Sequence, residues 1–517
     1  MKEKMMNNLA FDLGASSGKI HVSDYDGKKL SLKGIHRFDN GAVETEGSLY
    51  WDFPMILEQY KEGILKALSE YPSLSSVGVD SFCNDFSLIG NQGELLIPVR
   101  SYRDPRTIRN EESIYARMSK EELYSISGNQ IAPFNTLMQL AAMQIEGQGG
   151  LLKDARQLLL LPDLLAYFLT GECYTERTLA SVTQMYDHGS RDWSDEVLGR
   201  FGIERRIFAP FIDAGSFAGE TSAAAFDGGD IWQALRGGAV PGRDDIHTSK
   251  IFSLPKGLRV CAVPGHDTAT AFMAAQADEN TLVISGGTWM LVGCETKNPV
   301  ISDFGFRHNI ANEGGIDGRH RLIRNLMGFW ILQEVHREFD SENVEWDFDS
   351  IKEAAEKLPS FKWLFDVDLP EFYSPGDMRR KISNLCMKTY GSAPETPAEF
   401  TASVCESLAF KARWAMEKLE KLAGRRFECV NIIGGASKNG FLAQIIADVT
   451  GLPALCGPSD ASALVNIMFQ LMAFGELADV SEGRNLIRES VPLTHYEPKA
   501  VSQAGEAYER FIKTFSL

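Results

Sequence analysis

The chain repeats one local pattern, once near its N-terminus and once in its second half. An apolar run reaches Asp12 and enters a turn of small residues at 14–18, and a second apolar run, 281–285, enters the turn Gly286-Gly287. Apolar runs that end in Gly and Ser predict strands followed by tight turns. Two such hairpins in 517 residues predict an α/β architecture with one hairpin in each half.

The elements predicted around the hairpins alternate between strands and helices. In the first half we expect strands at 8–12, 19–24, 30–38 and 76–80, a helix at 55–71, mainly helical structure at 110–145 and 150–200, and a buried strand turning into a core helix at 158–169. In the second half we expect strands at 281–285, 289–294 and 427–433 and helices at 326–340, 399–423, 441–450 and 463–477. The Gly- and Ala-rich stretch 214–256 predicts loops or a surface subdomain. We place the domain boundary near residue 275, between domains 1–275 and 276–517.

Charge and cysteine usage narrow the classes of partner. The net charge is −18 and the pI is near 5.1, which argues against nucleic acid or a membrane as a main partner, because both require a basic surface. An anionic nucleotide would then need backbone donors and a cation. The eight cysteines form no CxxC pair, and the N-terminus lacks a signal-peptide core. These features predict a cytoplasmic protein with reduced cysteines.

Three turns are candidates for phosphate contacts. In the first, 12–19, Gly and Ser allow backbone N–H groups to converge on an anion, and Asp12 could hold Mg²⁺ through water. The turns at 286–288 and 434–439 follow predicted strands in the same way. Each turn alone is equally compatible with an ordinary connection, and none is a Walker A motif or a GxGxxG motif. The paired occurrence, one hairpin in each half, is what favours phosphate binding.

A single acid lies between the two hairpins in the sequence. Asp267 follows His266 and precedes Thr268, and it could be an ordinary helix N-cap. It could also be a general base that accepts a proton from a bound hydroxyl, and the two roles are compatible. The polar segment 80–86 could bind sugar hydroxyls or be a surface turn, and the charged segment 102–107 predicts an exposed ion pair.

Taken together and in order, these segments resemble the FGGY family of carbohydrate kinases over nearly the full length. The resemblance is carried by 12–19, Tyr102-Arg103-Asp104, 133–137, Leu161-Pro162-Asp163, His266-Asp267-Thr268, 285–289, Asn312-Glu313-Gly314-Gly315, 325–330 with Gln333, and Gly434-Gly435. Within the family it is greatest to the branch that acts on L-rhamnulose. The resemblance implies a two-domain, actin-like ATPase fold of the ribonuclease H type, with ATP and a ketose bound in a cleft between the domains.

The resemblance also implies roles for individual residues. Asp267 would be the catalytic base, and Asp12 would lie near Mg²⁺ and be joined to it through water. The sugar would contact Cys83, Asn84, Asp85, His266 and Thr268. ATP would contact Ala15, Ser16, Ser17, Gly18, Lys19, Gly286, Gly287, Thr288, Asn325, Gln333, Gly434, Gly435 and Ala436. The partners would be the ketose and ATP, with the chain a monomer or a homodimer.

The positions at which this chain departs from the family pattern lie more in the expected sugar-binding segment than in the expected nucleotide-binding segments. Where the L-rhamnulose branch reads Asp-Thr-Trp-Gly-Val-Asp-Phe, this chain reads Asp80-Ser81-Phe82-Cys83-Asn84-Asp85-Phe86. Ala436 stands where a third glycine is usual, and Val465 replaces the glycine of an Ala-x-Gly-Asn pattern. L-Rhamnulose is the first candidate substrate, and L-fuculose, another hexulose or pentulose, or an open-chain hydroxyketone are alternatives.

Two rival classes share the expected fold. A non-catalytic sugar or nucleotide sensor would not need to keep Asp12, Asp267 and Thr288. An actin-like chaperone ATPase would need a peptide-binding module, and the sequence contains no obvious one. The sequence therefore favours an enzyme.

Overall fold

The computed structural model describes residues 5–221, 238, 240–241, 257–276, 278–342, 348–373 and 376–517. The chain divides into two compact units. Unit 1 comprises Met1–Ala274, Lys297–His320 and Ser462–Ser490, and unit 2 comprises Ala275–Thr296, Arg321–Ala461 and Val491–Leu517. The first change of unit falls next to residue 275, but two later segments of the chain return to unit 1.

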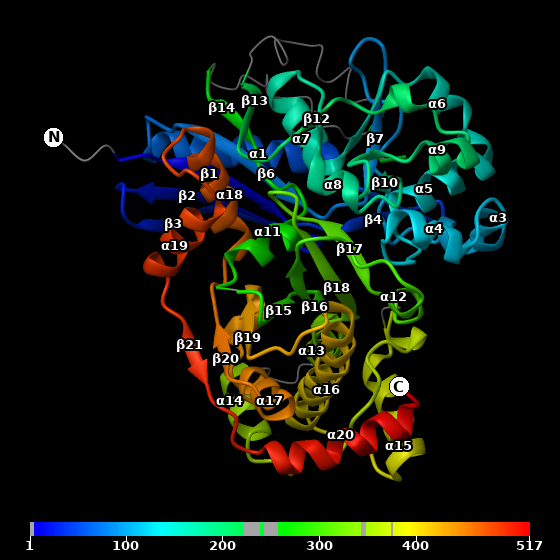
Figure 1. Cartoon of the computed structure of the whole chain (residues 1–517), viewed down its shortest axis with the longest axis vertical. Helices are drawn as coiled ribbons and strands as arrows, with labels where there is room; N and C mark the ends of the chain where they lie inside the picture. Colours follow the sequence, from blue (N-terminus) through cyan, green and yellow to red (C-terminus); the bar gives the residue numbers. More distant parts are fainter. Residues whose placement is uncertain are drawn as a thin grey trace. The chain divides into compact units, whose positions relative to one another are not determined.

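Unit 1 is built on a mixed sheet with the strand order β13-β14-β6-β1-β2-β3 (Figure 1). These strands are β1 (Asn8–Leu13), β2 (Ser17–Tyr25), β3 (Leu30–Asp39), β6 (Ser76–Ser81), β13 (Ser216–Glu220) and β14 (Arg259–Ala262). β1 and β14 both pair in parallel with β6, whereas β2 and β3 continue the sheet as an antiparallel meander. The carboxyl ends of β1, β6 and β14 therefore meet at one edge of the sheet.

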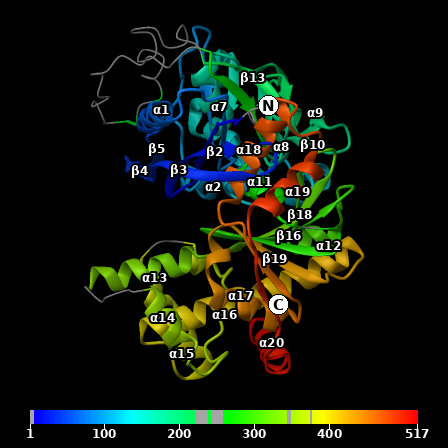
Figure 2. The same cartoon turned by 90° about the vertical axis from the view of Figure 1, so that its left-hand side faces the viewer.

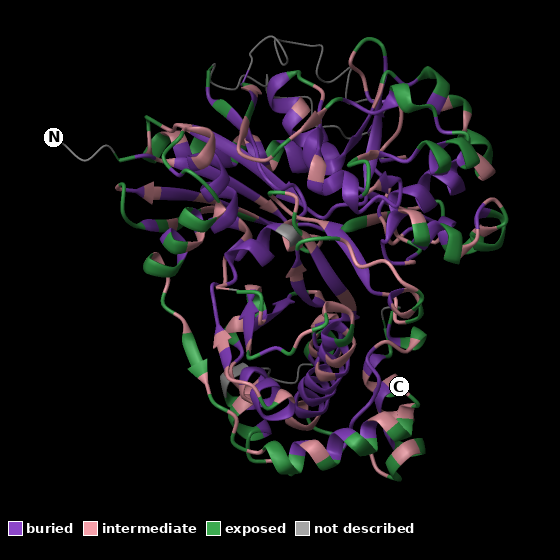
Figure 3. Cartoon of the chain, in the orientation of Figure 1, coloured by how far each residue is buried: buried purple, intermediate pink, exposed green. Residues whose placement is uncertain are grey.

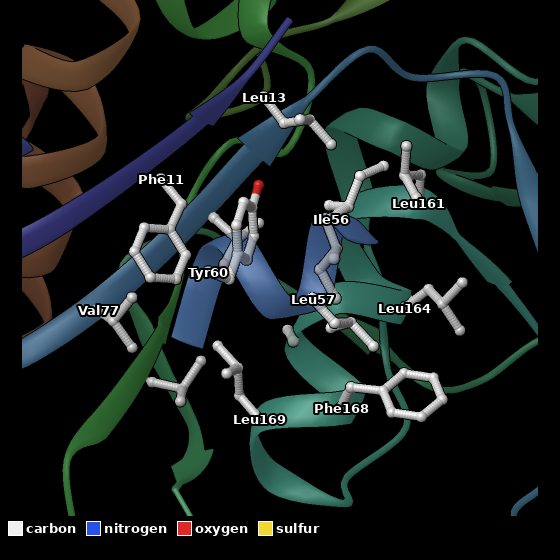
Figure 4. Packing of buried hydrophobic residues seen from close by; sticks show 14 of the residues in the cluster. Phe11, Leu13, Ile56, Leu57, Tyr60, Val77, Leu161, Leu164, Phe168 and Leu169 are labelled. Carbon is white, nitrogen blue, oxygen red and sulfur yellow. The ribbon is translucent and has the colours of Figure 1, made fainter. Parts of the chain in front are cut away.

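The two faces of β1 and β6 differ in polarity because successive side chains point to opposite faces. Phe11, Leu13 and Val77 join a hydrophobic core with helices α1 (Phe53–Glu70) and α7 (Leu161–Thr170), as Figure 4 shows. The alternate residues Asn8, Asp12, Ser76 and Asp80 belong to the other face, where polar side chains of α18 (Ala461–Ala473) bond to them. This polar face is the one that leads to the candidate site.

The rest of unit 1 forms a second core around α5 (Thr136–Met143) and β8 (Gln157–Leu160). The other helices and strands of unit 1 are β4 (Ala42–Thr45), β5 (Ser48–Trp51), β7 (Phe86–Ile89), α2 (Arg106–Arg109), α3 (Glu111–Tyr115), α4 (Lys120–Ser127), α6 (Gly150–Asp154), β9 (Thr175–Glu176), α8 (Arg177–Ser181), β10 (Tyr186–Asp187), β11 (Asp192–Trp193), α9 (Asp195–Phe201), β12 (Phe211–Ile212), α11 (Asp267–Ala274), α12 (Asp303–Arg307), β17 (Ala311–Gly314) and α19 (Val480–Ser490).

Unit 2 contains a second sheet, in which the strands run β18-β16-β15-β19-β20-β21. They are β15 (Thr281–Gly286), β16 (Trp289–Thr296), β18 (His320–Met327), β19 (Cys429–Ile433), β20 (Ala454–Cys456) and β21 (Thr494–Tyr496). β15 and β16 form the second hairpin, and β19 pairs in parallel with β15. Its helices are α13 (Trp330–Ser341), α14 (Phe348–Ala355), α15 (Met378–Tyr390), α16 (Pro397–Ala423), α17 (Gly440–Thr450) and α20 (Val501–Phe515).

Helix α16 shows how the sequence sets the length of an element in unit 2 (Figure 2). Thr396 and Glu399 form a capping box at its start, Pro397 occupies the first turn, and Gly424 ends it in a left-handed conformation. Each of these residue types is favoured at its position because it satisfies or avoids the unpaired groups of a helix end. Nearly all side chains from Phe400 to Ala412 are buried (Figure 3).

Most of the predicted elements are confirmed, with shifts at their ends. The first strands, helix α1 and the strand-to-helix transition at 158–169 lie where the sequence predicts them. The helix expected at 326–340 was placed too early, because β18 continues to Met327 and α13 begins at Trp330. The helix expected at 463–477 ends at Ala473. Of the stretch 214–256, the structure describes β13 and a few neighbouring residues, and most of it lies outside the described residues.

All eight cysteines are free thiols, and six of them are buried. No helix within the described ranges combines the length and the apolar character that a membrane span requires.

Candidate functional site

Three acidic side chains lie at the carboxyl ends of three neighbouring parallel strands of unit 1. Asp12 is in register with Asp80 across β1 and β6. Asp267 follows β14, and the backbone of the connecting segment joins the end of β6, where the Ser81 N–H donates to Gly265 O at 2.9 Å. The carboxyl ends of parallel strands are where ligands bind in open α/β sheets. The sheet therefore brings together residues that are far apart in the sequence.

Asp267 is the first residue of α11, and its side chain keeps 30% of its surface exposed. Its Oδ1 accepts hydrogen bonds from Thr268 N at 2.5 Å and from Thr268 Oγ1 at 2.8 Å. Burial, with the negative charges of Asp12 and Glu313 adding to it, raises the pKa of Asp267 to about 6. A carboxylate with this pKa is ionised at neutral pH and can still accept a proton.

His266 and Thr268 connect Asp267 to a second buried acid. Thr268 Oγ1 lies 2.8 Å from His266 Nε2, and His266 Nδ1 lies 3.6 Å from Oε2 of Glu313. Glu313 is buried on β17. Because Thr268 can donate to Asp267 while it accepts from the imidazole, one oxygen of Asp267 is held by the protein. Both predicted neighbours of the base are thus placed around it.

Asp12 and Asp80 face α18. Asp12 is half-buried, and its Oδ2 accepts from Ser462 Oγ at 2.9 Å, while Asp80 is fully buried and accepts from Asn466 Nδ2 at 2.6 Å. Burial, followed by the charge of Asp12, raises the pKa of Asp80 well above its usual range. Asp80 is therefore a structural partner of Asn466 rather than a second exposed carboxylate, whereas Asp12 remains open to solvent.

The turn after Asp12 contains residues of two kinds. Ala15, Ser16 and Ser17 lie in or next to the turn, with Ser16 exposed, and Asn40 fixes the loop through its bonds to Gly14 O and Ser16 O. Ser17 is the first residue of β2, and Gly18 and Lys19 lie within that strand. A Cβ atom at Gly18 would lie 2.1 Å from the Phe38 ring, so packing alone accounts for a glycine there.

The three predicted sugar contacts at 83–85 differ in their surroundings. Cys83 and Asn84 are 7% and 8% exposed, and Asn84 Nδ2 lies 3.3 Å from Cys83 Sγ. Asp85 is fully buried, and its two oxygens accept from Trp51 Nε1 at 2.6 Å, Tyr102 N at 3.0 Å and Gln139 Nε2 at 2.9 Å. These bonds make Asp85 an anchor for its own loop, and its contact with a sugar hydroxyl stays a prediction.

In unit 2 the two glycine-rich turns lie side by side. β15 and β19 are parallel and in register up to Ser285 and Ile433, so the turns that follow them, 286–288 and 434–436, are neighbours. A Cβ atom at Gly286 would lie 2.3 Å from Ala436 Cβ, and Gly434 takes a φ of +71° next to Gly286 O. Gly287 is exposed, with open space where a side chain would project. Ala436 is buried, and its methyl group packs against Gly286.

The backbone after β18 supports the second hairpin. Phe329 N donates to Gly287 O at 3.1 Å, and Trp330 N donates to Thr288 O at 3.2 Å. Asn325 lies on β18 and is half-buried, and Gln333 is exposed on the first turn of α13. The predicted nucleotide residues of unit 2 therefore come from elements that contact one another. Their contact with ATP stays a prediction.

The predicted metal residue fits a cation held indirectly. No group of three or more His, Cys, Asp or Glu side chains in the described parts of the chain is arranged to hold a metal ion directly. Asp12 has one oxygen bonded to Ser462, and its neighbours Asp80 and Asp267 are both acids whose pKa its charge raises. Such a negative region suits a hydrated Mg²⁺, which keeps several of its waters.

Comparison with known proteins identifies the family. The model of the N-terminal domain of the FGGY family of carbohydrate kinases matches residues 7–229, and the model of the C-terminal domain of that family matches residues 282–474. The chain belongs to the FGGY family of carbohydrate kinases. The expected resemblance and enzyme class are confirmed, and this FGGY kinase is an ATP-dependent carbohydrate kinase.

Curated relatives of this FGGY kinase match nearly its full length. Rhamnulokinase of Bacteroides thetaiotaomicron is 34% identical over 510 residues, which cover 98% of each chain, and rhamnulokinase of Enterococcus faecalis is 32% identical with 98% coverage of each. Rhamnulokinase of Yersinia pestis is 35% identical and covers 95% of each chain.

Solved structures show the same fold at lower identity. Xylulose kinase from Lactobacillus acidophilus superposes with a TM-score of 0.78 over 99% of this chain and 98% of its own, at 13% identity. Plasmodium falciparum glycerol kinase with ADP gives a TM-score of 0.73 at 13% identity, over 98% and 97% of the two chains. The expected actin-like ATPase fold is confirmed.

Several residues around the acids were not among the predicted site residues. Ser462 and Asn466 come from α18, and Glu313 comes from β17. Asn466 ends the Ala-x-x-Asn segment in which Val465 replaces a glycine, and Glu313 lies in the segment 312–315, so both were within recognised motifs. No recognised sequence motif contained Ser462 or Glu176. Glu176 accepts a hydrogen bond from Gly265 N.

Proposed function

We propose that this FGGY kinase transfers the γ-phosphoryl group of ATP to the primary hydroxyl of L-rhamnulose, with Asp267 as the general base. The substrate rests on the curated rhamnulokinases, which are 32% to 35% identical to the chain over at least 95% of its length. The base rests on one observation, the half-buried Asp267 at the carboxyl-end edge of the sheet with one oxygen held by Thr268.

The proposed reaction needs one proton acceptor and no covalent intermediate. The hydroxyl oxygen of the ketose forms a bond to the γ-phosphorus as the bond between that phosphorus and the bridging oxygen of ADP breaks. The hydroxyl proton passes to the free carboxylate oxygen of Asp267. Thr268 orients the carboxylate through the other oxygen, so the accepting lone pair is fixed before the ketose binds.

Two groups of residues would hold the nucleotide and its cation. The N–H of Gly287 donates to Trp289 O at 2.8 Å, and the backbone N–H groups of Phe329 and Trp330 support the exposed turn, so the N–H of Thr288 would donate to the phosphates, as would that of Ser16 in the first hairpin. Asp12 would hold Mg²⁺ through water, and bound Mg²⁺ neutralises charge on the phosphate oxygens.

Cys83 and Asn84 are the residues in which the sugar preference could differ from that of other rhamnulokinases. Asn84 places an amide where the L-rhamnulose branch has an apolar side chain, and its Oδ1 has only a long contact of 3.5 Å with Thr136 Oγ1. A buried amide without partners costs about 1–3 kcal/mol, so a ketose that can bond to it gains relative to one that cannot. L-Fuculose is therefore the second candidate.

A panel of ketoses with ATP and Mg²⁺ tests this proposal. We expect kcat/KM to be highest for L-rhamnulose, with measurable transfer to L-fuculose and less to L-xylulose. In Asn84→Val the ratio of kcat/KM between the first two sugars should change by about fivefold or more, which corresponds to about 1 kcal/mol. No transfer to any of the three ketoses would refute the proposed substrate class. An unchanged ratio in Asn84→Val would refute only the role of Asn84.

A further inference from the structure

A short helix, α8, packs against the segment that carries Asp267. Glu176 at the start of α8 accepts a hydrogen bond from Gly265 N at 3.1 Å, and the side chain of Leu179 on the same helix occupies the space next to Gly265. Gly265 lies two residues before Asp267 and one before His266. The helix therefore touches the backbone from which both side chains project.

Glu176 is buried, with 1% of its surface exposed, and four donors surround its carboxylate. Oε1 accepts from Thr178 N at 2.9 Å, and Oε2 accepts from Thr178 Oγ1 at 2.5 Å, Leu179 N at 3.1 Å and Gly265 N at 3.1 Å. Three of these bonds cap the first turn of α8. The fourth crosses to a segment 89 residues away in the sequence.

The length of the side chain matters for this fourth bond. A helix start needs only a short acceptor, and Ser, Thr, Asp and Asn are the residues favoured there. Glu176 has one methylene group more than Asp, and with it the same carboxylate reaches both the helix and Gly265. Capping alone does not explain a glutamate, whereas a bridge between α8 and the segment 264–267 does.

Gly265 is held on every side. Its N–H donates to Glu176, its carbonyl accepts from Ser81 N at 2.9 Å, and a Cβ atom added to it would lie 2.5 Å from Leu179 Cδ1. The backbone of Glu176 is fixed in turn, because its N–H donates to the buried Asp163 at 3.1 Å. Glu176 thus links the buried Asp163 in unit 1 to Gly265, which lies two residues before the proposed base.

The other end of α8 holds the second acid near His266. Ser181 Oγ accepts from Gly314 N at 2.8 Å, and Gly314 adjoins Glu313, whose Oε2 lies 3.6 Å from His266 Nδ1. A Cβ atom at Gly314 would lie 2.9 Å from Ser181. One helix therefore contacts the backbone on both sides of the His266 imidazole.

We propose that Glu176 is a positioning residue for Asp267: its carboxylate fixes the backbone of Gly265 and thereby the direction in which the base projects. This inference rests on the proposed function, because it takes Asp267 as the base. Glu176 touches neither ketose nor ATP in this account. Its loss should slow the transfer step and leave the binding of both substrates unchanged.

The test is Glu176→Asp, which keeps a favoured cap for α8 but shortens the reach to Gly265. We expect kcat to fall by about tenfold to a hundredfold, since a small misplacement of a reacting group has effects of this size, with the KM values for ketose and ATP within about twofold of wild type. Thr178→Val, which removes one donor to Glu176 but leaves the Gly265 bond, should keep kcat within about threefold.

Glu406→Asp is the matched control. Glu406 is also a buried glutamate, 5% exposed, that accepts a hydrogen bond from a distant backbone N–H, that of Phe361 at 2.8 Å, but it lies on α16 in unit 2. The same truncation there should leave kcat unchanged. If Glu406→Asp lowers kcat as much as Glu176→Asp at an equal loss of melting temperature, the effect is general destabilisation and the inference fails.

Other outcomes separate the inference from the proposed function on which it rests. Wild-type kcat in folded Glu176→Asp, or a raised KM at constant kcat, would overturn the positioning role, while a large loss in Asp267→Asn measured alongside would leave the base in place. Transfer by Asp267→Asn near the wild-type rate would overturn both. Should Glu176→Asp not fold, Gly265→Ala disturbs the packing of α8 on the same backbone, because its Cβ atom would lie 2.5 Å from Leu179 Cδ1, and it should show the same loss of kcat at constant KM.

Discussion

At the scale of single residues, the environment of Asp267, the proposed base, bears on the pH range of phosphoryl transfer. Its pKa is raised to about 6, chiefly by burial and then by the charges of Asp12 and Glu313. Below this pH the carboxyl is protonated and cannot accept the hydroxyl proton. In the unfolded chain its pKa would be near 3.9, so the folded state favours the protonated form, and ionisation of Asp267 costs stability as pH rises through 6.

The expected consequence is opposite trends of activity and stability for this group. We expect kcat/KM for the ketose to rise about tenfold per pH unit below pH 6 and to level off above it, because kcat/KM reports the free enzyme and only the ionised base accepts a proton. Rates at subsaturating ketose, with activity restored when the pH is returned to neutral, measure this dependence. A kcat/KM that stays constant from pH 7 down to pH 5 would be incompatible with Asp267 as the titrating base.

The predicted site residues that the structure brings together follow strand ends, whereas their bonding partners come from distant segments. His266, Asp267 and Thr268 bond to one another at the end of the strand–turn segment after β14, and their roles stay predictions. Trp51, Tyr102 and Gln139 bond to the oxygens of Asp85, and these partners come from segments whose proximity no local pattern reveals. Ser462 was missed for the same reason, since it lies 450 residues from Asp12 in the sequence.

At the scale of elements, the two turns of unit 2 lie side by side, and we propose that they bind phosphates. Gly286 must be glycine because Ala436 fills the space next to it, and Gly434 takes a positive φ that disfavours a side chain. Gly287 differs from both, because nothing lies where its side chain would project. Packing therefore does not require a glycine at 287, whereas the proposed approach of a phosphate would.

Replacing Gly287 should weaken the binding of ATP and leave the binding of the ketose unchanged. In Gly287→Val we expect the Kd for ATP to rise about tenfold or more, since a branched side chain over the turn excludes a phosphate from its N–H groups, with ketose affinity and melting temperature unchanged. Calorimetric titration of ATP and of ketose measures both. Gly41→Val is the matched control, because Gly41 is also exposed and unobstructed. Unchanged ATP affinity in folded Gly287→Val would show that this turn does not contact the phosphates.

Elements were predictable to the extent that they depend on local patterns. The hairpins and helix α16 follow from apolar periodicity, capping residues and glycines. The end of β18 and the start of α13 did not follow, because residues 326 and 327 begin the apolar run 326–332, which suits either a strand or a helix. Contacts within the sheet, which periodicity does not describe, decide such cases.

At the scale of the whole molecule, the course of the chain explains how the site is assembled in unit 1. The segments Lys297–His320 and Ser462–Ser490 leave unit 2 and rejoin unit 1, and they supply Glu313, Ser462 and Asn466 next to the acids of the sheet. A boundary near residue 275 describes the first change of unit but not these returns. Whether a later segment of the chain packs in unit 1 depends on long-range contacts, and a single sequence does not reveal these contacts.

The rate of ketose phosphorylation by Asp267→Asn tests whether Asp267 accepts the hydroxyl proton during transfer. Asparagine keeps the shape of the side chain and can still accept from Thr268, but it is not a base. We expect transfer at neutral pH to fall by about a hundredfold or more, with ATP affinity kept and the melting temperature equal or higher, because a buried charge is removed. Transfer within about tenfold of wild type by the folded variant would contradict the account.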